Sequence, residues 1–303
     1  FYFVSIFPYI STQSTPEERS YLFGSNMAVW TGSAILGSFL AGQLPGLFQL
    51  HPAVTTAITA KRFALLLAAA LVLLALIPIL RMKANPEHPR EKHPLSSTSL
   101  KPKFVQNWSI IALLAVMLGI SGLAVGLTIP FINIFFSNAL QLSDAVIGSI
   151  YSLSQFGALL SALFVPLVVK RFGLIKGPSL LYGSNAVFLL LMGFSLPALA
   201  ITASYLISVS LERLADAPLQ NMVMEMVPNQ DRGAMSGIRL LTNYGVQAIS
   251  GVVGGRILFH LGYSSLFFIA AAINLLTGVV IWVLFNKRQE ELETSQLTAT
   301  QPG

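Results

Sequence analysis

The chain lacks cysteine entirely, and only 10% of its 303 residues are charged, against about a quarter in soluble domains. The absence of cysteine excludes disulfides and thiolate metal sites, and it leaves the redox compartment open. The four histidines lie apart, and the sequence contains no phosphate-binding loop and no nucleophile beside a base. We therefore expect no catalytic residue, no bound metal and no cofactor, so the chain is not expected to be an enzyme.

Hydrophobic residues, in contrast, make up 54% of the chain, and the mean hydropathy is +0.71. A helix needs about 20 mostly apolar residues to cross a bilayer, because backbone polar groups find no water in hydrocarbon. The apolar runs predict an all-α polytopic membrane protein with eight full crossings, preceded by a shorter apolar stretch at residues 1–12. The lipid bilayer is therefore the first expected partner.

Two distant stretches of the sequence share one plan. A shift of 213 positions places Glu18 and Arg19 on Asp231 and Arg232, and it superimposes three glycine pairs: Gly24 on Gly237, Gly32 on Gly245 and Gly42 on Gly255. Small residues at such positions suit helices that pack closely in a membrane. The apolar run before the later copy extends back about 124 residues, whereas 18 residues precede the earlier Arg. If the halves match, we expect about a hundred residues to be missing from the front.

Composition divides the chain into four parts. We interpret residues 1–80 as the end of a first helical bundle, 81–106 as a polar linker rich in proline and charge, 107–286 as a complete six-helix second bundle, and 287–303 as a flexible tail. Most lysines and arginines fall on the linker side of the predicted crossings, which favours a cytoplasmic linker and tail. The net charge of +6 is therefore attributed to topology, and no nucleic acid is expected as a partner.

Particular stretches resemble the major facilitator superfamily. IPFINIFF and IGSIYSLSQFGALLSALFVPLVVKRFG resemble the seventh and eighth helices of bacterial members. The turn PLVVKRFGLIKG resembles the second copy of the family's basic loop motif and keeps Arg171, Gly173 and Lys176, but it departs at Pro166 and Lys170. The resemblance covers the chain as helices four (in part) to twelve of a twelve-helix plan with an incomplete N-terminal half.

This resemblance implies a secondary active transporter that works by alternating access around a central cavity. Its expected partners are a small-molecule substrate and protons, and its direction, drug or metabolite efflux or solute uptake, stays open. A monomer in the bacterial inner membrane is expected. The alternatives are an intramembrane enzyme acting on lipid-linked substrates, or a membrane scaffold or receptor that transports nothing.

One helix holds the most informative polar residues. Ser204, Ser208, Glu212, Asp216 and Gln220 follow at four-residue steps and form a slowly rotating stripe. A charged residue at the bilayer centre costs about 2.5 to 3.5 kcal/mol, so these side chains must face protein or water. Arg213 either neutralises one carboxylate in a purely structural cluster, or a carboxylate lines the substrate and proton pathway. The resemblance favours the pathway, because it implies that this tenth helix lines the cavity.

The following helix carries a second stripe of Arg239, Asn243 and Gln247. Arg239 either extends back to the interface, contacts an anion, or pairs with Glu225 in a cytoplasmic gate. Asn243 and Gln247 are further candidates for the pathway.

The remaining candidates are amides and loop residues. Asn133 and Gln155 are expected to be buried on their helices, either in interhelical hydrogen bonds or in contact with substrate. Asp144 is expected to cap the helix that follows it. The candidates for cytoplasmic loops and gates are Glu18, Arg19, Arg171, Gly173, Glu225, Asp231, Arg232 and Arg239.

Overall fold

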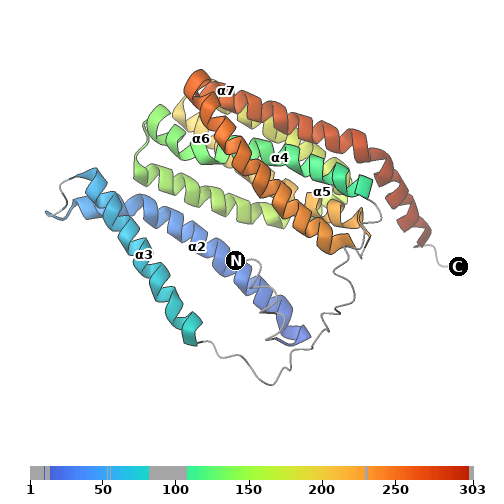
Figure 1. Cartoon of the computed structure of the whole chain (residues 1–303), viewed down its shortest axis with the longest axis horizontal. Coiled ribbons are helices and arrows are strands. Elements are labelled where there is room, and N and C mark those ends of the chain that lie inside the picture. The colour runs from blue at the N-terminus through green and yellow to red at the C-terminus, as the bar shows by residue number, and fades with distance from the viewer. Residues whose placement is uncertain are drawn as a thin grey trace. The chain divides into compact units, whose positions relative to one another are not determined.

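The computed structural model describes residues 10, 14–52, 54, 56–81, 108–228 and 231–299, without the side chains of residues 16, 17, 19, 20 and 286–299. The apolar stretch at 1–12 and the linker at 81–106 thus fall almost entirely outside the described residues. In the described parts the helices are α2 (Pro16–Gln49), α3 (Ala57–Arg81), α4 (Trp108–Ile134), α5 (Asp144–Gly193), α6 (Ala198–Glu225) and α7 (Arg232–Ala299), and a π-helical turn, η1 (Phe135–Ala139), extends α4 (Figure 1).

Six helical segments within the described ranges are long and apolar enough to cross a membrane. Two of them, Asp144–Gly193 and Arg232–Phe285, are each interrupted by a glycine with a non-helical backbone, so each consists of two helices. The segments therefore match the eight crossings expected from the apolar runs. The prediction of an all-α polytopic membrane protein is confirmed.

The interrupting glycines are Gly173 (φ 77°, ψ 177°) and Gly262 (φ 78°, ψ −179°). This backbone region is open essentially to glycine alone, because a Cβ would clash with the residue's own backbone. Gly173 belongs to the basic turn that was a loop candidate. Its role in the structure is to end one helix and begin the next.

Gly262→Ala is expected to destabilise the protein by about 1–3 kcal/mol, the usual cost of a non-glycine residue in this backbone region. A Cβ at Gly262 would have no neighbour within 4 Å, so the effect would arise from the backbone alone. Thermal unfolding in detergent measures it. Gly183→Ala is the matched control, because Gly183 is helical and its Cβ would also meet nothing within 4 Å; equal unfolding temperatures for the two variants would contradict the interpretation.

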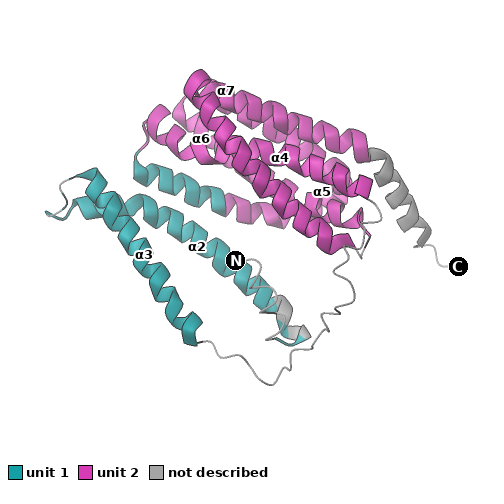
Figure 2. Cartoon of the chain, viewed as in Figure 1, with its two compact units in different colours: residues 1–104, 143–155 teal, residues 105–142, 156–303 magenta. Residues whose placement is uncertain are grey.

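The chain forms two compact units (Figure 2). Unit 1 comprises residues 1–104 together with 143–155, and unit 2 comprises 105–142 together with 156–303. Helix α5 therefore begins in unit 1 and continues into unit 2. The four-part division drawn from composition stays a prediction, and the packing groups the first turns of α5 with the helices before the linker.

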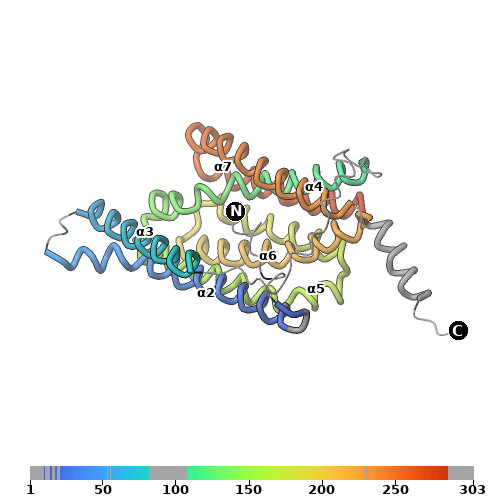
Figure 3. Tube along the Cα trace, turned by 60° about the horizontal axis from the view of Figure 1, so that its bottom comes forward, coloured from blue at the N-terminus to red at the C-terminus, as the bar shows by residue number. Residues whose placement is uncertain are grey.

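In unit 1, α2 and α3 form a helical hairpin (Figure 3). The Phe48 and Phe63 rings contact each other near its turn, with centroids 6.1 Å apart. At the other end of α2, the Glu18 carboxylate accepts a hydrogen bond from the backbone N–H of Thr15 at 3.2 Å. Glu18 thus caps the helix. The side chain of Arg19, its neighbour in the predicted gate, lies outside the described side chains.

In unit 2, α4 packs along α7 and the two share a core with α5 and α6. Small residues of α4 meet the backbone of α7: a Cβ on Gly126 would lie 2.5 Å from the carbonyl oxygen of Gln247. The core is aliphatic and methionine-rich, and its most buried members include Ile111, Leu114, Met117, Ile175, Met222, Val223, Met235 and Ile281.

Two of the three glycine pairs of the suspected repeat have similar surroundings. A Cβ on Gly24, Gly32, Gly237 or Gly245 would meet no atom within 4 Å. Gly42 and Gly255, the third pair, each face another helix, although Gly42 is much the tighter of the two. The internal repeat itself remains a prediction.

Candidate functional site

The polar stripe of α6 turns from the protein interior toward the surface along the helix. Ser204 and Ser208 are buried, Glu212 and Asp216 are half-buried, and Gln220 is exposed. The Arg213 guanidinium lies 3.5 Å from the Asp216 carboxylate, one turn further along the helix. This ion pair is the neutralising contact expected from the sequence for one of the two carboxylates. Glu212 has no ion-pair partner within 4.0 Å among the described residues.

Two other helices, α5 and α7, bring polar groups to these carboxylates, and α4 adds a hydroxyl behind one of those groups. Tyr182, from the second part of α5, is buried and lies within electrostatic reach of both Glu212 and Asp216. Its hydroxyl is in hydrogen-bonding reach of Ser121 on α4. Arg239, from α7, lies within electrostatic reach of Asp216. We call Ser121, Tyr182, Glu212, Asp216 and Arg239 the carboxylate site; all five belong to unit 2.

Arg239 is the member of this site with an unmet hydrogen bond. Its Nε atom is buried and makes no hydrogen bond. The proposed gate partner, Glu225, is exposed, and no ion pair joins it to Arg239 in the described ranges. The gate therefore stays a prediction, and so do the other two readings of Arg239, extension to the interface and contact with an anion.

Asn243 and Gln247 lie where α7 packs against α4. The Gln247 side-chain amide donates a hydrogen bond to the Asn243 carbonyl oxygen one turn earlier on α7. Both residues lie against glycines of α4, with Asn243 facing Gly122 and Gln247 facing Gly126. The two amides are therefore hydrogen-bonded to each other beside a close helix crossing, and their role in the pathway stays a prediction.

The expectation that Asn133 is buried is wrong. Its side chain is exposed, because the residues that pack inward at this point are Ile132 of α4 and Phe136 of η1. Gln155, at the end of the α5 segment in unit 1, is half-buried. The prediction that Asp144 caps the following helix is also wrong. The hydroxyl of Ser143 accepts the hydrogen bond from the Val146 backbone N–H at 3.4 Å. Asp144 forms an ion pair with Lys61 instead.

The loop candidates at the start of α7 tie two helices together. The Arg232 Nε donates to the carbonyl oxygens of Met224 at 3.0 Å and Val227 at 3.4 Å, which are left without partners where α6 ends. Asp231 is buried, and its backbone N–H donates to the Pro228 carbonyl at 2.9 Å. Arg171 is exposed, with its guanidinium 5.7 Å from the centroid of the Phe172 ring.

A second buried polar cluster was missed from the sequence. The Ser208 hydroxyl donates to the Asn185 side-chain carbonyl at 2.5 Å, and the Asn185 amide donates to the Asn274 carbonyl at 3.4 Å. The cluster joins α6 to the later parts of α5 and α7, one turn from Glu212. The feature of the sequence that could have revealed this cluster is a single amide in each of the apolar runs LLYGSNAVFLLLMG and FFIAAAINLLTGVV. Such amides hold membrane helices together by hydrogen bonds.

No group of three or more histidine, aspartate or glutamate side chains placed to hold a metal ion occurs in the part of the chain that the structure describes. The carboxylate site instead combines two acids, one arginine, a phenol and a hydroxyl, and Arg213 pairs with one of the two acids. Such a set can bind a polar solute through charge and hydrogen bonds, and its carboxyl groups can exchange protons with water.

Comparisons with known proteins agree with this architecture. The model of the Major Facilitator Superfamily matches residues 114–301. No curated protein matches the chain. One similar solved structure is the crystal structure of a bacterial homologue of the iron transporter ferroportin in an inward-facing state. It has a TM-score of 0.62 and 18% sequence identity, and the alignment covers 90% of this chain.

The chain spans 65% of the length of that ferroportin homologue, and at this level of identity the likeness concerns the fold alone. The family match, however, covers more than half of the chain and includes every helix of the carboxylate site. It agrees with the expectation of a membrane protein that is not an enzyme. The chain belongs to the major facilitator superfamily, a family of multi-pass membrane transporters.

Proposed function

We propose that the protein is a secondary active transporter that moves a small solute by alternating access and couples this movement to protons. The observation that carries the proposal is the carboxylate site. Glu212 and Asp216 lie within a membrane-spanning helix near the phenol of Tyr182, and Asp216 also lies near Arg239. An ionic residue within a membrane helix costs free energy unless its side chain faces protein or water.

The two carboxylates have different surroundings, and this difference supports a division of roles. Asp216 lies 3.5 Å from Arg213 and near Arg239, so positive charge balances it. Glu212 has no such fixed partner among the described residues, so gain or loss of a proton changes its charge directly. We assign proton exchange to Glu212. Asp216 and Arg239 are then left to orient a polar solute.

The protein is proposed to act in the bacterial inner membrane, with the linker and tail on the cytoplasmic side. This orientation is supported by the bias of lysine and arginine toward the linker side. Proteoliposomes loaded with the pH indicator pyranine test the transport proposal. Ethidium and a pool of polar metabolites are added outside, and coupling predicts that at least one addition changes the internal pH in a protein-dependent way.

A pH that stays constant for every addition, together with solute accumulation that ignores an imposed pH gradient, would contradict proton coupling. Solute accumulation without any pH change would leave transport standing and would remove the proton from the proposal. The same liposomes without protein give the baseline for leakage.

A further inference from the structure

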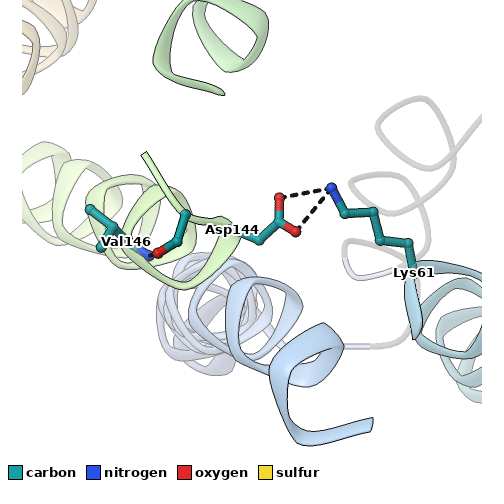
Figure 4. Close-up of polar contacts among 4 residues, drawn as sticks. Lys61, Asp144 and Val146 are labelled. Carbon is teal, nitrogen blue, oxygen red and sulfur yellow. Dashed lines mark hydrogen bonds and ion pairs between the residues drawn. The ribbon is translucent and has the colours of Figure 1, made fainter. Parts of the chain in front are cut away.

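The first turn of α5 is fastened to α2 and α3 in unit 1. The Lys61 ammonium lies 2.9 Å and 3.0 Å from the two carboxylate oxygens of Asp144 (Figure 4). The Gln43 amide donates to the Ala145 carbonyl oxygen at 3.3 Å and to the Ser149 hydroxyl at 3.5 Å. Residues more than 80 positions apart in the sequence are thus joined by polar contacts at one end of the unit.

One turn further along α5, its backbone touches the backbone of α2. A Cβ on Gly148 would lie 2.6 Å from the Cα of Gly42 and 2.7 Å from the carbonyl oxygen of Ser38. Neither glycine can therefore gain a methyl group unless the helices separate. The polar contacts and the glycine crossing are different in kind, because an ion pair can open and close while the backbone contact is set by shape.

We propose that Lys61, Asp144 and Gln43 form a releasable latch, the α5 latch, which closes unit 1 at the end where α3 begins, and that the Gly42–Gly148 crossing is the pivot on which it opens. The inference extends the proposed function by naming the contact whose release opens one side. Beyond Gln155, α5 continues as helix to Gly173. A movement of its first turns is therefore transmitted along the same helix.

The strength of the pair suits a latch. Lys61 and Asp144 are 53% and 39% exposed, so solvent screens their attraction. Ion pairs of this kind shift an equilibrium by roughly two- to fivefold. A pair of this strength shifts the equilibrium toward the closed state without preventing opening. A contact that opens in every transport cycle must have this property.

The experiment measures the distance between α3 and the start of α5 without any solute. Ile58 and Val146 are exposed on these two elements, and the chain has no cysteine, so Ile58→Cys with Val146→Cys gives two unique sites for spin labels. Pulsed electron paramagnetic resonance in proteoliposomes then gives the distance distribution. The protein with these two labels and no other change, the background protein, is expected to show mainly the short distance of the closed latch.

Lys61→Gln and Asp144→Asn are each expected to raise the ratio of the long-distance to the short-distance population by roughly two- to fivefold. The charge exchange, Lys61→Asp with Asp144→Lys, is expected to restore the original distribution. Gly148→Ala is expected to lengthen the distance even with the pair intact, whereas Gly37→Ala, whose Cβ would meet nothing within 4 Å, leaves it unchanged.

Identical distributions in the background protein and both single variants would overturn the latch, and so would failure of the charge exchange to restore the distance in a protein that elutes as a single folded species. Because no transport is measured, these outcomes bear on the latch alone. A protein without solute-dependent proton movement but with the expected distance changes would contradict the proposed function and keep the latch.

Discussion

Glu212→Gln is expected to abolish proton movement driven by solute, down to the level of liposomes without protein. The change keeps the size of the side chain and its hydrogen-bonding carbonyl, but it removes the group that binds and releases a proton. Glu212 has no fixed ion-pair partner in the described structure, so no other charge is left unbalanced by the substitution. Insertion and folding should therefore be retained, and the measurement is the pyranine signal in proteoliposomes.

The control for this variant is Glu293→Gln, which removes a carboxylate from the predicted tail rather than from α6. It should retain the full signal and its dependence on pH. Uptake by the Glu212→Gln variant that kept the pH dependence of the parent protein would remove Glu212 from the mechanism. Asp216→Asn is expected to differ from it, because loss of that carboxylate leaves Arg213 and Arg239 without their acidic neighbour.

Gly126→Ala is expected to destabilise the second bundle by about 1–3 kcal/mol, the usual effect of overfilling a packed interior. The new methyl group would overlap the Ser250 hydroxyl and would lie 2.5 Å from the carbonyl oxygen and 2.8 Å from the Cα of Gln247. Two of these three atoms belong to the backbone of α7. The methyl group can be accommodated only if α4 and α7 move apart, and thermal unfolding in detergent measures the loss.

Gly245→Ala is the matched control on α7, because its Cβ would meet nothing within 4 Å. Alanine favours the helix over glycine by about 1 kcal/mol, so this variant should be as stable as the parent or more so. An unfolding temperature for Gly126→Ala equal to that of Gly245→Ala would show that α4 and α7 are not in backbone contact.

The class of fold could be predicted because it depends on composition. Runs of about 20 apolar residues leave no alternative to membrane helices, and the stripe on α6 follows from helical periodicity alone. The pairing of Arg213 with a carboxylate was predictable for the same reason, since Asp216 is one turn away on the same helix. Local spacing determines these contacts, and the sequence displays local spacing directly.

Contacts between helices were not predictable in the same way. Tyr182 and Asn185 lie on a helix whose sequence is otherwise apolar, and only the packing of α5 against α6 brings them to Glu212 and Ser208. Asp144 was misjudged because its position at the start of a helix suggested a cap, whereas Lys61, 83 residues earlier, had no local signal as its partner. Asn133 was misjudged because an apolar run does not reveal which of its faces packs inward.

The carboxylate stripe of α6 is expected to face water within the protein, whereas Ile207, on another face of the helix than Glu212, is expected to meet lipid. Single cysteines at Glu212 and at Ile207, which is 41% exposed, test it in a chain without native cysteine. A thiol reacts as its thiolate, which forms in water. A charged, water-soluble thiol reagent is expected to modify the cysteine at position 212 and to leave the one at 207 unmodified; modification at 207 with protection at 212 would contradict a water-facing carboxylate site.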